Sequence, residues 1–468
     1  MEMNTRRQFF SRIADGLHGA ALMSLLGGDL NAAQTFDLTP KAPHFAAKAK
    51  SVIHLFMNGG PSQVDLFDPK PKLQQLAGTA PSRELSFAIS NGKDAGTLMP
   101  TPFEFKNRGK SGLEISNALP HIAECADEIA VIRSMYGEHA NHEPALFLMH
   151  TGRTIASRPS IGAWVAYGLG TENQNLPAYV VLDDPKGLPI NGISNWQSAY
   201  LPPIYQGTRF RTEGAPVLNL EPRPEIPTKL MEAERDLLRK LDNMHRAQRQ
   251  YQPELDARIS SYELAARMQM AASDALDLNK ESEATREAYG LNDPVTASYG
   301  KRCLMARRLV ERGVRFVQLY IESQIWDTHS NLKNDLTAAC NKTDKPTAAL
   351  LKDLKQRGLL DQTLVVWGGE FGRLPISQGA PKSAGRDHGP NGFSVWLAGG
   401  GVKRGVAFGT TDDIGFKAAD NKVSVHDFHA TVLHLLGLNN RELFIERNGL
   451  KDRLTDQYPA RVVSEILA

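Results

Sequence analysis

Six short apolar runs are spaced along the chain, and each is bounded by glycine, proline or a polar cluster. They lie at 50–57, 128–135, 177–182, 314–321, 362–369 and 393–401. Most are apolar at nearly every position rather than at every second one. This pattern predicts strands that are buried on both faces of a sheet.

Helical periodicity fills several of the intervals between these runs. Residues 299–313 and 347–358 each carry leucines at helical spacing and end at a glycine just before an apolar run. Residues 426–438 predict an amphipathic closing helix. Helices that alternate with continuously apolar strands predict an α/β fold, with a doubly wound and mostly parallel sheet.

Residues from about 222 to 289 interrupt this alternation. The segment is rich in charged residues, helical in period and free of strand signals. We predict a helical insertion packed over the sheet, within a single domain that covers residues 34–468.

The N-terminal segment, residues 1–33, has a basic start, a modestly apolar middle and small residues near its end. Its "TRRQFF" stretch resembles a twin-arginine export signal. An amphipathic first helix with a chance Arg-Arg pair is the alternative. The first interpretation predicts export by the twin-arginine machinery and a periplasmic or extracellular location. No other stretch has the ~20 apolar residues of a membrane span, so we expect no membrane anchor.

Composition narrows the classes of function. Lys and Arg number 54 against 52 Asp and Glu, for a formal net charge of +2, so we expect no nucleic-acid partner. Three cysteines without tight spacing indicate neither a disulfide framework nor a thiolate metal site. No glycine-rich nucleotide motif is present, so a nucleotide cofactor is not expected.

Carboxylate and imidazole side chains stand where the predicted strands end. In doubly wound sheets, ligands bind outside the carboxyl ends of the strands. Neutral histidine together with Asp or Glu predicts a divalent metal, Zn²⁺ first, with Ca²⁺, Mn²⁺ or Mg²⁺ as alternatives. The candidate metal ligands are Asp65, Asp327, His329, Glu370 and His388.

Each candidate also has a purely structural alternative. Glu370 in its Gly-Gly-Glu turn has the residue type of a helix cap. Asp327 and His329 fit a loop turn in which the aspartate bonds its own backbone. For Asp65, turn geometry and metal binding both stay open. The common position of Asp327, His329 and Glu370 at strand ends favours the metal interpretation. His142 is a further candidate, either as a catalytic residue or as a structural residue at a helix start.

Five segments carry a resemblance to a known family: "FMNGGPSQVDLFDPKP", "NHEPALFLMHTGR", "WDTHSN", "VVWGGEFGR" and "GRDHGPNGFSVWLAGGGVKRG". In order and spacing they resemble the alkaline phosphatase and sulfatase superfamily. More narrowly, the chain resembles the domain of unknown function 1501 family over nearly its whole mature length. The resemblance implies the alkaline phosphatase/sulfatase type of α/β fold, and metal-binding roles for Glu370, His388, Asp327 and His329.

The segment "NHEPALFLMHTGR" has the spacing of the sulfatase nucleophile signature. Pro144 and the Thr-Gly-Arg ending at Arg153 match, but His142 stands where the family has Cys, Ser or Thr. The resemblance therefore implies catalytic roles for Asn141, His142 and Arg153. His142 either attacks the sulfur or phosphorus atom or protonates the leaving group. Alternatively, a metal-bound hydroxide attacks directly.

The resemblance also indicates residues that contact substrate. At the first strand the family's metal-binding Asp pair is replaced by Asn58-Gly59, so Ser62 and Asp65 are the nearest substitutes. Arg373 and Arg153 are candidates to bind a sulfate or phosphate group, or else to hold a carboxylate in place. Ser62, Arg373 and Asn391 are predicted to bind substrate. Ser62 is equally suited to cap a helix.

These expectations lead to an exported metal-dependent hydrolase of anionic esters, whose partner is a small-molecule or polysaccharide ester. A sulfatase acting on sulfated carbohydrate is the first choice, and a phosphatase or phosphodiesterase of the same fold is the alternative. A non-catalytic binding or structural exoprotein is the alternative from another class, and an oxidoreductase using non-haem iron is a third. The missing nucleophile supports the binding protein, while the retained ligands oppose it.

Overall fold

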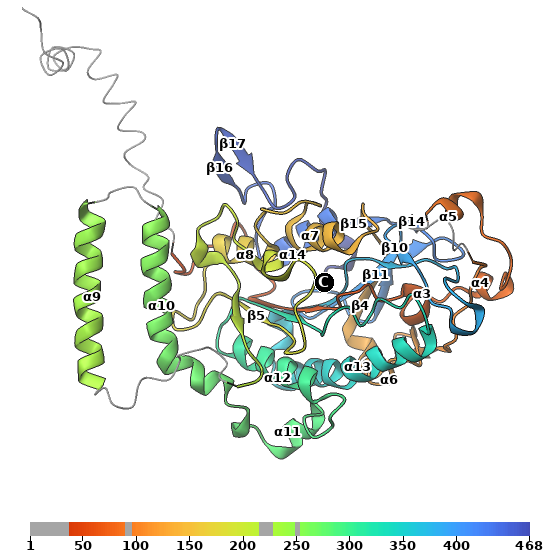
Figure 1. Cartoon of the computed structure of the whole chain (residues 1–468), viewed down its shortest axis with the longest axis horizontal. Coiled ribbons are helices and arrows are strands. Elements are labelled where there is room, and N and C mark those ends of the chain that lie inside the picture. The colour runs from red at the N-terminus through yellow and green to blue at the C-terminus, as the bar shows by residue number, and fades with distance from the viewer. Residues whose placement is uncertain (1–36, 89–95, 215–227, 249–252) are drawn as a thin grey trace, which may run out of the picture.

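A central nine-stranded sheet runs through the protein (Figure 1). The computed structural model describes residues 37–88, 96–214, 228–248 and 253–468, and the expected export signal lies outside them. Along the sheet the strand order is β12-β4-β11-β8-β1-β7-β5-β6, and β15 also pairs with β4. The strands are β1 (Ser51–Phe56), β4 (Ile129–Tyr136), β5 (Tyr179–Leu182), β6 (Thr208–Phe210), β7 (Phe316–Tyr320), β8 (Thr363–Gly368), β11 (Phe393–Ala398), β12 (Val406–Phe408) and β15 (Val423–Ser424).

Every pairing in this sheet is parallel except those of β11, which runs antiparallel to both β4 and β8. Trp396 of β11 lies opposite Trp367 of β8, and their rings stack at 6.0 Å. Because β11 is reversed, its first residues lie at the edge where the parallel strands end. Residues that precede β11 therefore meet residues that follow β7 and β8.

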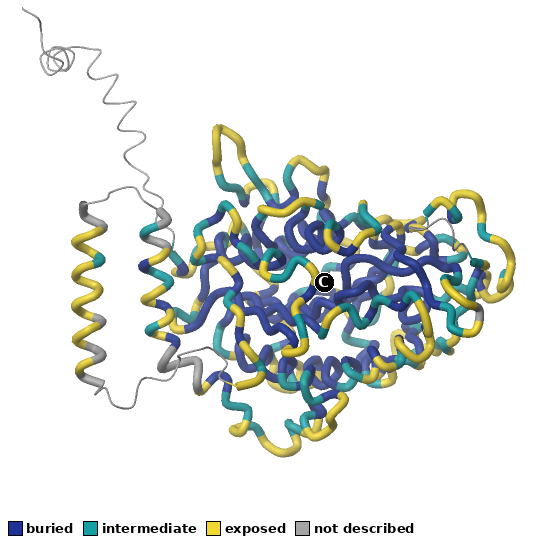
Figure 2. The backbone as a smooth tube through the Cα atoms, in the orientation of Figure 1, coloured by how far each residue is buried: buried dark blue, intermediate teal, exposed yellow. Residues whose placement is uncertain are grey.

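Helices cover both faces of the sheet: α7, α8 and α14 on one, and α6, α12 and α13 on the other (Figure 1). This explains why β1, β8 and β11 are buried at every position, as the dark central elements in Figure 2 show. Apart from the short α6, the helices on the two faces are α7 (His142–Thr151), α8 (Ile161–Leu169), α12 (Ala297–Glu311), α13 (Leu332–Gln356) and α14 (Val425–Leu435).

Short elements surround this core. The short helices are α3 (Gln63–Leu66), α4 (Pro71–Gln75), α5 (Arg83–Phe87) and α6 (Pro120–Ala123). The two-stranded sheets are β2 (Phe105–Arg108) with β3 (Leu113–Ser116), β9 (Gly372–Arg373) with β10 (His388–Gly389), β13 (Thr410–Thr411) with β14 (Ala418–Asp420), and β16 (Ile445–Arg447) with β17 (Leu450–Asp452). Among them, β9 and β10 matter most for function, because they join the segments after β8 and before β11.

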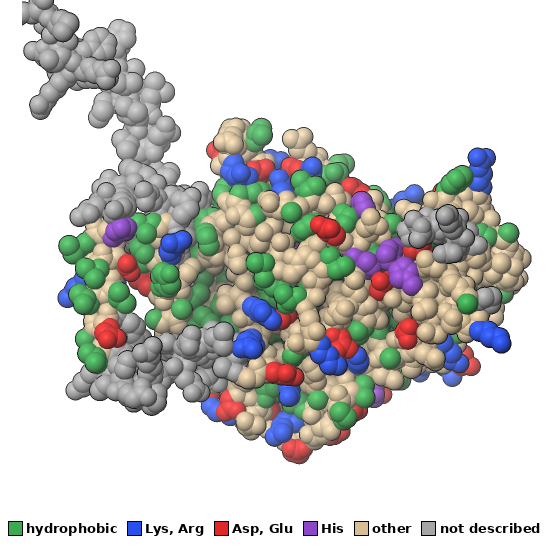
Figure 3. Space-filling model, viewed as in Figure 1, with side chains coloured by type: hydrophobic (Ala, Val, Ile, Leu, Met, Phe, Trp, Pro, Cys, Tyr) green, Lys and Arg blue, Asp and Glu red, His purple; other side chains and the backbone are tan. Residues whose placement is uncertain are grey.

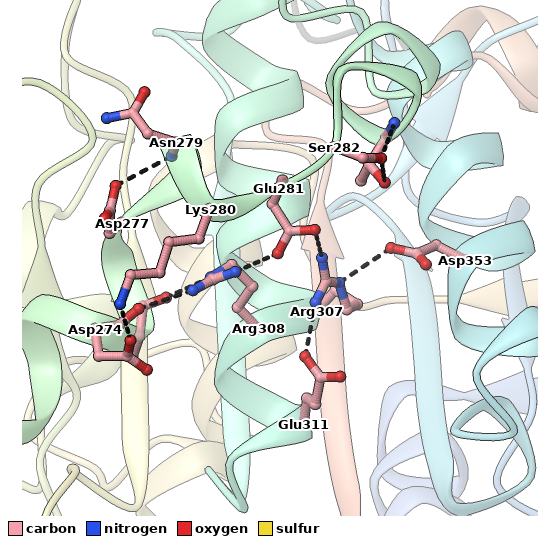
Figure 4. Close-up of polar contacts among 12 residues, drawn as sticks. Asp274, Asp277, Asn279, Lys280, Glu281, Ser282, Arg307, Arg308, Glu311 and Asp353 are labelled. Carbon is pink, nitrogen blue, oxygen red and sulfur yellow. Dashed lines mark hydrogen bonds and ion pairs between the residues drawn. The ribbon is translucent and has the colours of Figure 1, made fainter.

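Between β6 and α12 the chain forms α9 (Thr228–Gln248), α10 (Pro253–Leu276) and α11 (Glu283–Ala288). An ion-pair network ties this stretch to α12 and α13 (Figure 4). Glu281 pairs with Arg308 and with Arg307 at 2.7 Å, and Arg307 also reaches Asp353 of α13 at 3.0 Å. These linked ion pairs hold the segment around Glu281 against α12, and α12 against α13.

The expected doubly wound, mostly parallel α/β fold is confirmed, and all six predicted strands are present. The edge strands β6, β12 and β15 were not predicted, since each has only two or three residues. The helix predicted at 347–358 is only the last part of α13, which ends at Gln356 and extends back through Pro346 to Leu332. Among the residues described, none of the helices is long and apolar enough to span a membrane.

Candidate metal centre

Histidine side chains gather on one face of the protein, beside acidic side chains (Figure 3). They come from segments at the same edge of the sheet. Asp327 and His329 lie in the loop between β7 and α13, Glu370 follows β8, and His388 begins β10. His142 is the first residue of α7, after β4.

The carboxylate of Asp327 is the centre of this group. Its Oδ1 atom lies 2.9 Å from Nε2 of His329 and 3.2 Å from Nε2 of His388. Its Oδ2 atom lies 3.3 Å from Nε2 of His142. The two Nε2 atoms of His329 and His388 are 3.0 Å apart. Three imidazoles therefore present the same ring nitrogen to one carboxylate.

The other nitrogen of each ring meets an acceptor oxygen. Nδ1 of His388 lies 2.6 Å from the carbonyl oxygen of Ala140, and Nδ1 of His329 lies 2.5 Å from Oε1 of Gln378. Nδ1 of His142 lies 2.6 Å from Oε1 of Glu370. Each oxygen accepts a hydrogen bond from the Nδ1–H group, so a neutral ring presents a lone pair at Nε2. This arrangement is typical of histidines that bind a metal.

A divalent cation fits these donors. The Nε2 atoms of His329 and His388 face each other at 3.0 Å, and two lone pairs there would repel unless a proton or a metal cation lies between them. Among the described residues, two groups that share His388 could each hold a metal ion. The donor atoms within each group lie within 4.8 Å of one another, and the groups are His142, Asp327 and His388, and His329, Asp387 and His388. Imidazole nitrogens with carboxylate oxygens suit Zn²⁺ better than Ca²⁺ or Mg²⁺, which prefer oxygen.

Arg373 holds Asp327 from the protein side. Its Nη2 atom donates to Oδ1 of Asp327 at 2.6 Å and also to the carbonyl oxygen of Gly59. Its Nε and Nη1 atoms donate to the carbonyl oxygens of Gly60 and Arg386. The side chain is fully buried and its donors are used within the protein. These contacts favour a positioning role for Arg373 over contact with substrate.

Gly59 and Gly60 allow the metal-binding segments to approach closely. Gly59 has φ +111° and donates its N–H to Oε1 of Glu370 at 2.9 Å. A Cβ atom on Gly59 would lie 2.7 Å from the backbone nitrogen of Asp327. A Cβ atom on Gly60, with φ +81°, would lie 2.6 Å from the ring of Phe371. The Gly-Gly pair after β1 is therefore required by the packing around the site.

The carboxylates stabilise positive charge at this position. Burial alone would lower the pKa of His142, but Asp327 and Glu370 raise it above its ordinary value. The hydrogen bond to Asp327 likewise raises the pKa of His329, whereas burial keeps the pKa of His388 below its ordinary value. Burial would raise the pKa of Asp327, yet the three imidazoles and the guanidinium hold it well below the usual range.

The structure brings six of the predicted site residues together: His142, Asp327, His329, Glu370, Arg373 and His388. Within this group Glu370 does not face the other imidazoles. It is 2% exposed, and its oxygens accept the N–H of Gly59 and of the His142 ring. Its position is that of a residue that orients His142.

The remaining predicted residues lie outside the group. Asp65 is fully buried and forms a two-point ion pair with Arg386 at 2.8 and 3.1 Å, and Ser62 donates to the same carboxylate. Arg153 lies beyond the far end of α7 and pairs with Asp456 at 2.6 Å. Asn391 is exposed in a turn before β11.

Asn141 occupies the N-cap position of α7, but its side chain makes no capping hydrogen bond there. It is exposed, and its backbone N–H donates to Nδ1 of His139 at 3.0 Å. The N-terminus of α7, with its partial positive charge, is thus left uncapped beside His142.

Sequence reasoning missed two residues that support the site. Gln378, the partner of His329, lies in an irregular loop after β9 with no pattern to mark it. Arg386 stands two residues before His388, and a fully buried arginine there was indicated only by its place in the "GRDHG" motif.

Comparisons with known proteins identify the family. Residues 49–467 match the family described as "Protein of unknown function (DUF1501)", and the chain belongs to it. No curated protein sequence matches the chain.

The chain is also similar to several solved structures. With the lipoteichoic acid synthase LtaP from Listeria monocytogenes it shares 12% identity, over 91% of this chain and 81% of that chain, at a TM-score of 0.37. With the PsFucS1 sulfatase from Pseudoalteromonas sp. it shares 13% identity, over 90% and 72%, at 0.36. With a TAB5 alkaline phosphatase variant with Mg bound it shares 13% identity, over 84% and 100%, at 0.34.

Proposed function

We propose that the protein is a metal-dependent hydrolase of anionic esters. In this proposal Asp327 and the three imidazoles that face it hold one divalent cation, most suitably Zn²⁺. One observation carries the proposal: three Nε2 atoms converge on one carboxylate, while every Nδ1 atom is bonded to an acceptor oxygen. A bound cation of this kind neutralises charge on ester oxygens and makes a water molecule nucleophilic at neutral pH.

His142 acts as a ligand in this proposal and does not attack the ester. Its Nδ1 atom is held by Glu370, and its buried Nε2 atom has no hydrogen-bond partner and lies 3.3 Å from Oδ2 of Asp327, among the proposed ligands. Its ring also packs against Phe371, with centroids 4.8 Å apart, which restricts its rotation. Because His142 occupies the position of the expected covalent nucleophile, we propose direct attack by water.

The anionic part of the substrate is placed beside α7. The uncapped N-terminus of α7 offers backbone N–H groups and a partial positive charge next to His142. Without a cation, Asp327, Glu370 and Asp387 outweigh the charge of Arg373 and repel an anion. Cation binding should therefore come before ester binding.

The ester itself is proposed from the sequence resemblance. Sulfate esters of carbohydrates come first, because Pro144 and Arg153 match the sulfatase signature, and phosphate mono- or diesters come second. Export by the twin-arginine route to the periplasm or the exterior is part of the same proposal and rests on residues 1–33.

The test combines metal content and turnover. We expect stoichiometric metal in the purified protein, and loss of metal in Asp327→Asn and His388→Ala. His434→Ala, in the last turn of α14, is the control and should keep the metal. The loaded enzyme is then assayed against sulfate and phosphate esters. Metal without turnover of any ester would instead support the non-catalytic binding protein, and absence of metal after reconstitution with Zn²⁺, Mn²⁺ and Ca²⁺ would refute the proposed centre.

A further inference from the structure

The segment that follows β5 lies at the same edge of the sheet as the candidate metal centre. Strand β5 is the parallel neighbour of β7, and the loop after β7 carries Asp327. In such a sheet, ligands bind outside the carboxyl ends of the parallel strands. Residues 183–196, which we name the β5 loop, therefore extend beside the proposed ligands. The proposed function gives them no role.

Two contacts fix the β5 loop between segments that carry proposed ligands. The side-chain amide of Asn191 donates to the carbonyl oxygen of Glu143, in the first turn of α7, at 2.8 Å. Nζ of Lys186 lies 2.9 Å from Oε2 of Glu322, at the start of the loop that carries Asp327. The β5 loop thus runs from the first turn of α7 to the segment before Asp327, along one side of the candidate centre.

The start of the β5 loop is held in place by buried carboxylates. Asp184 forms a buried ion pair with Arg302 of α12, and its Oδ1 atom accepts the N–H of Lys186 at 3.0 Å. Asp183 forms a two-point ion pair with Arg209 at 2.7 and 2.5 Å. A surface that is fixed before a ligand arrives costs little conformational entropy when the ligand binds.

The side chains that the β5 loop leaves in water are aliphatic. Leu188 is 39% exposed, Ile190 38% and Ile193 61%. The amides of Asn191 and Asn195 both donate to backbone carbonyl oxygens, that of Asn195 to Ile190 at 2.7 Å. Figure 3 shows hydrophobic side chains on the same face as the histidines. The β5 loop therefore offers mainly apolar surface to a molecule held at the metal.

We propose that the β5 loop binds the organic group of the ester, and that this group is apolar, an alkyl or aryl group. The inference rests on the proposed function, which puts the anionic part of the ester at the cation and beside α7. It narrows the substrate class, because the sequence resemblance puts carbohydrate esters first. Carbohydrate hydroxyl groups would lose water against these aliphatic side chains without gaining hydrogen bonds, which is unfavourable. An alkyl group instead removes apolar area of both molecules from water.

Isothermal titration calorimetry with the zinc-loaded full chain tests the proposal. The probes are butyl sulfate, octyl sulfate and a monosulfated glucose, each with its phosphate counterpart. A methylene group covered on one or both sides contributes about two- to fourfold in affinity, so octyl sulfate should bind at least about tenfold more tightly than butyl sulfate. The sugar ester should bind no more tightly than butyl sulfate. Where a probe is turned over, kcat/KM replaces the dissociation constant in this comparison.

Two matched variants separate this contact from a general affinity for apolar molecules. Ile193→Ser shortens the most exposed of the three side chains and should weaken the binding of octyl sulfate about threefold, and that of butyl sulfate less. Ile155→Ser is the control. Ile155 is 57% exposed but lies beyond the far end of α7, so both affinities should stay at the wild-type value.

The possible results distinguish failure of the apolar site from failure of the hydrolase. Tighter binding of the sugar ester than of octyl sulfate, or an equal response of the two serine variants, would overturn the apolar site alone. Octyl sulfate that binds equally well to Asp327→Asn would place the alkyl group away from the metal and would also overturn it. If no sulfate or phosphate binds to the zinc-loaded chain, the hydrolase itself is refuted, and the apolar site with it.

Discussion

Replacing Glu370 by Gln removes the negative charge of the carboxylate that bonds Nδ1 of His142, while keeping the shape of the side chain. In the wild type, Oε1 of Glu370 accepts from both the His142 ring, at 2.6 Å, and the Gly59 N–H, at 2.9 Å. The oxygen of a glutamine can keep both bonds. Its amide nitrogen then takes the place of Oε2, 3.2 Å from the Gly59 nitrogen, where two donors face each other.

The expected loss of metal affinity follows from these contacts. A carboxylate behind a metal-binding imidazole raises the basicity of the ring and fixes its orientation. Removing such a partner costs about 10- to 100-fold in metal affinity, which corresponds to roughly 1.4 to 2.8 kcal/mol. We expect Glu370→Gln to fall in this range and Glu370→Ala to lose more, because it leaves two buried N–H groups unpaired.

Competition with a chelating indicator measures the Zn²⁺ affinity of each variant. Glu143→Gln is the matched control, because Glu143 follows His142 directly in α7 but is exposed. It should bind Zn²⁺ like the wild type. If Glu370→Gln also binds like the wild type, the carboxylate does not act through His142 and the reasoning fails.

Two further predictions concern the surroundings of the site, and a third concerns the ion-pair network of Glu281. Gly59→Ala should destabilise the fold by about 2 kcal/mol or more, because φ is positive and the new Cβ lies 2.7 Å from the Asp327 nitrogen. Arg373→Lys should cost roughly 2 to 5 kcal/mol, because lysine cannot replace all four buried hydrogen bonds. Burial would raise the pKa of Glu281, but Arg307 and its neighbour lower it. The stability that this carboxylate provides is therefore complete above its unfolded pKa, about 4.3, and is lost as pH falls through the lower folded value.

Urea unfolding followed by circular dichroism checks the two substitutions, and wild-type stability in either variant would contradict them. For Glu281, the protection of α10 and α11 against hydrogen exchange, relative to the intrinsic rate at each pH, should fall below about pH 4.3 in the wild type. Glu281→Gln should show weaker protection without that pH dependence. An unchanged profile in this variant would mean that another acid governs the transition.

The fold was largely predictable because each central strand is buried on both faces and so appears as an unbroken apolar run. β11 shows the limit of that signal. Its apolar run looks the same in either direction, so its antiparallel course was not readable from the sequence. α13 shows another limit: Pro346 usually ends a helix. Here the preceding half of the helix stays in place because residues such as Leu332 and Leu336 are buried.

For the site, the rule that ligands gather at strand ends predicted the positions of the residues but not which way their side chains point. Glu370 follows β8 as a ligand would, yet it bonds the His142 ring. Arg153 matches a signature by spacing, but α7 is a ten-residue helix, so roughly 15 Å separate its two ends. Gln378 could not be predicted, because its partner His329 becomes a neighbour only in the folded chain.

The proposed metal ligands are far apart along the chain: Asp327 lies 61 residues before His388 and far beyond His142 in the sequence. A cation bound by all of them acts as a cross-link that closes two long loops. Its binding energy is available only once the sheet has assembled, so it belongs to the folding equilibrium. The unfolded chain should hold the ion poorly, and the folded chain should release it slowly. Metal binding, as a late step of folding, would then stabilise the native topology.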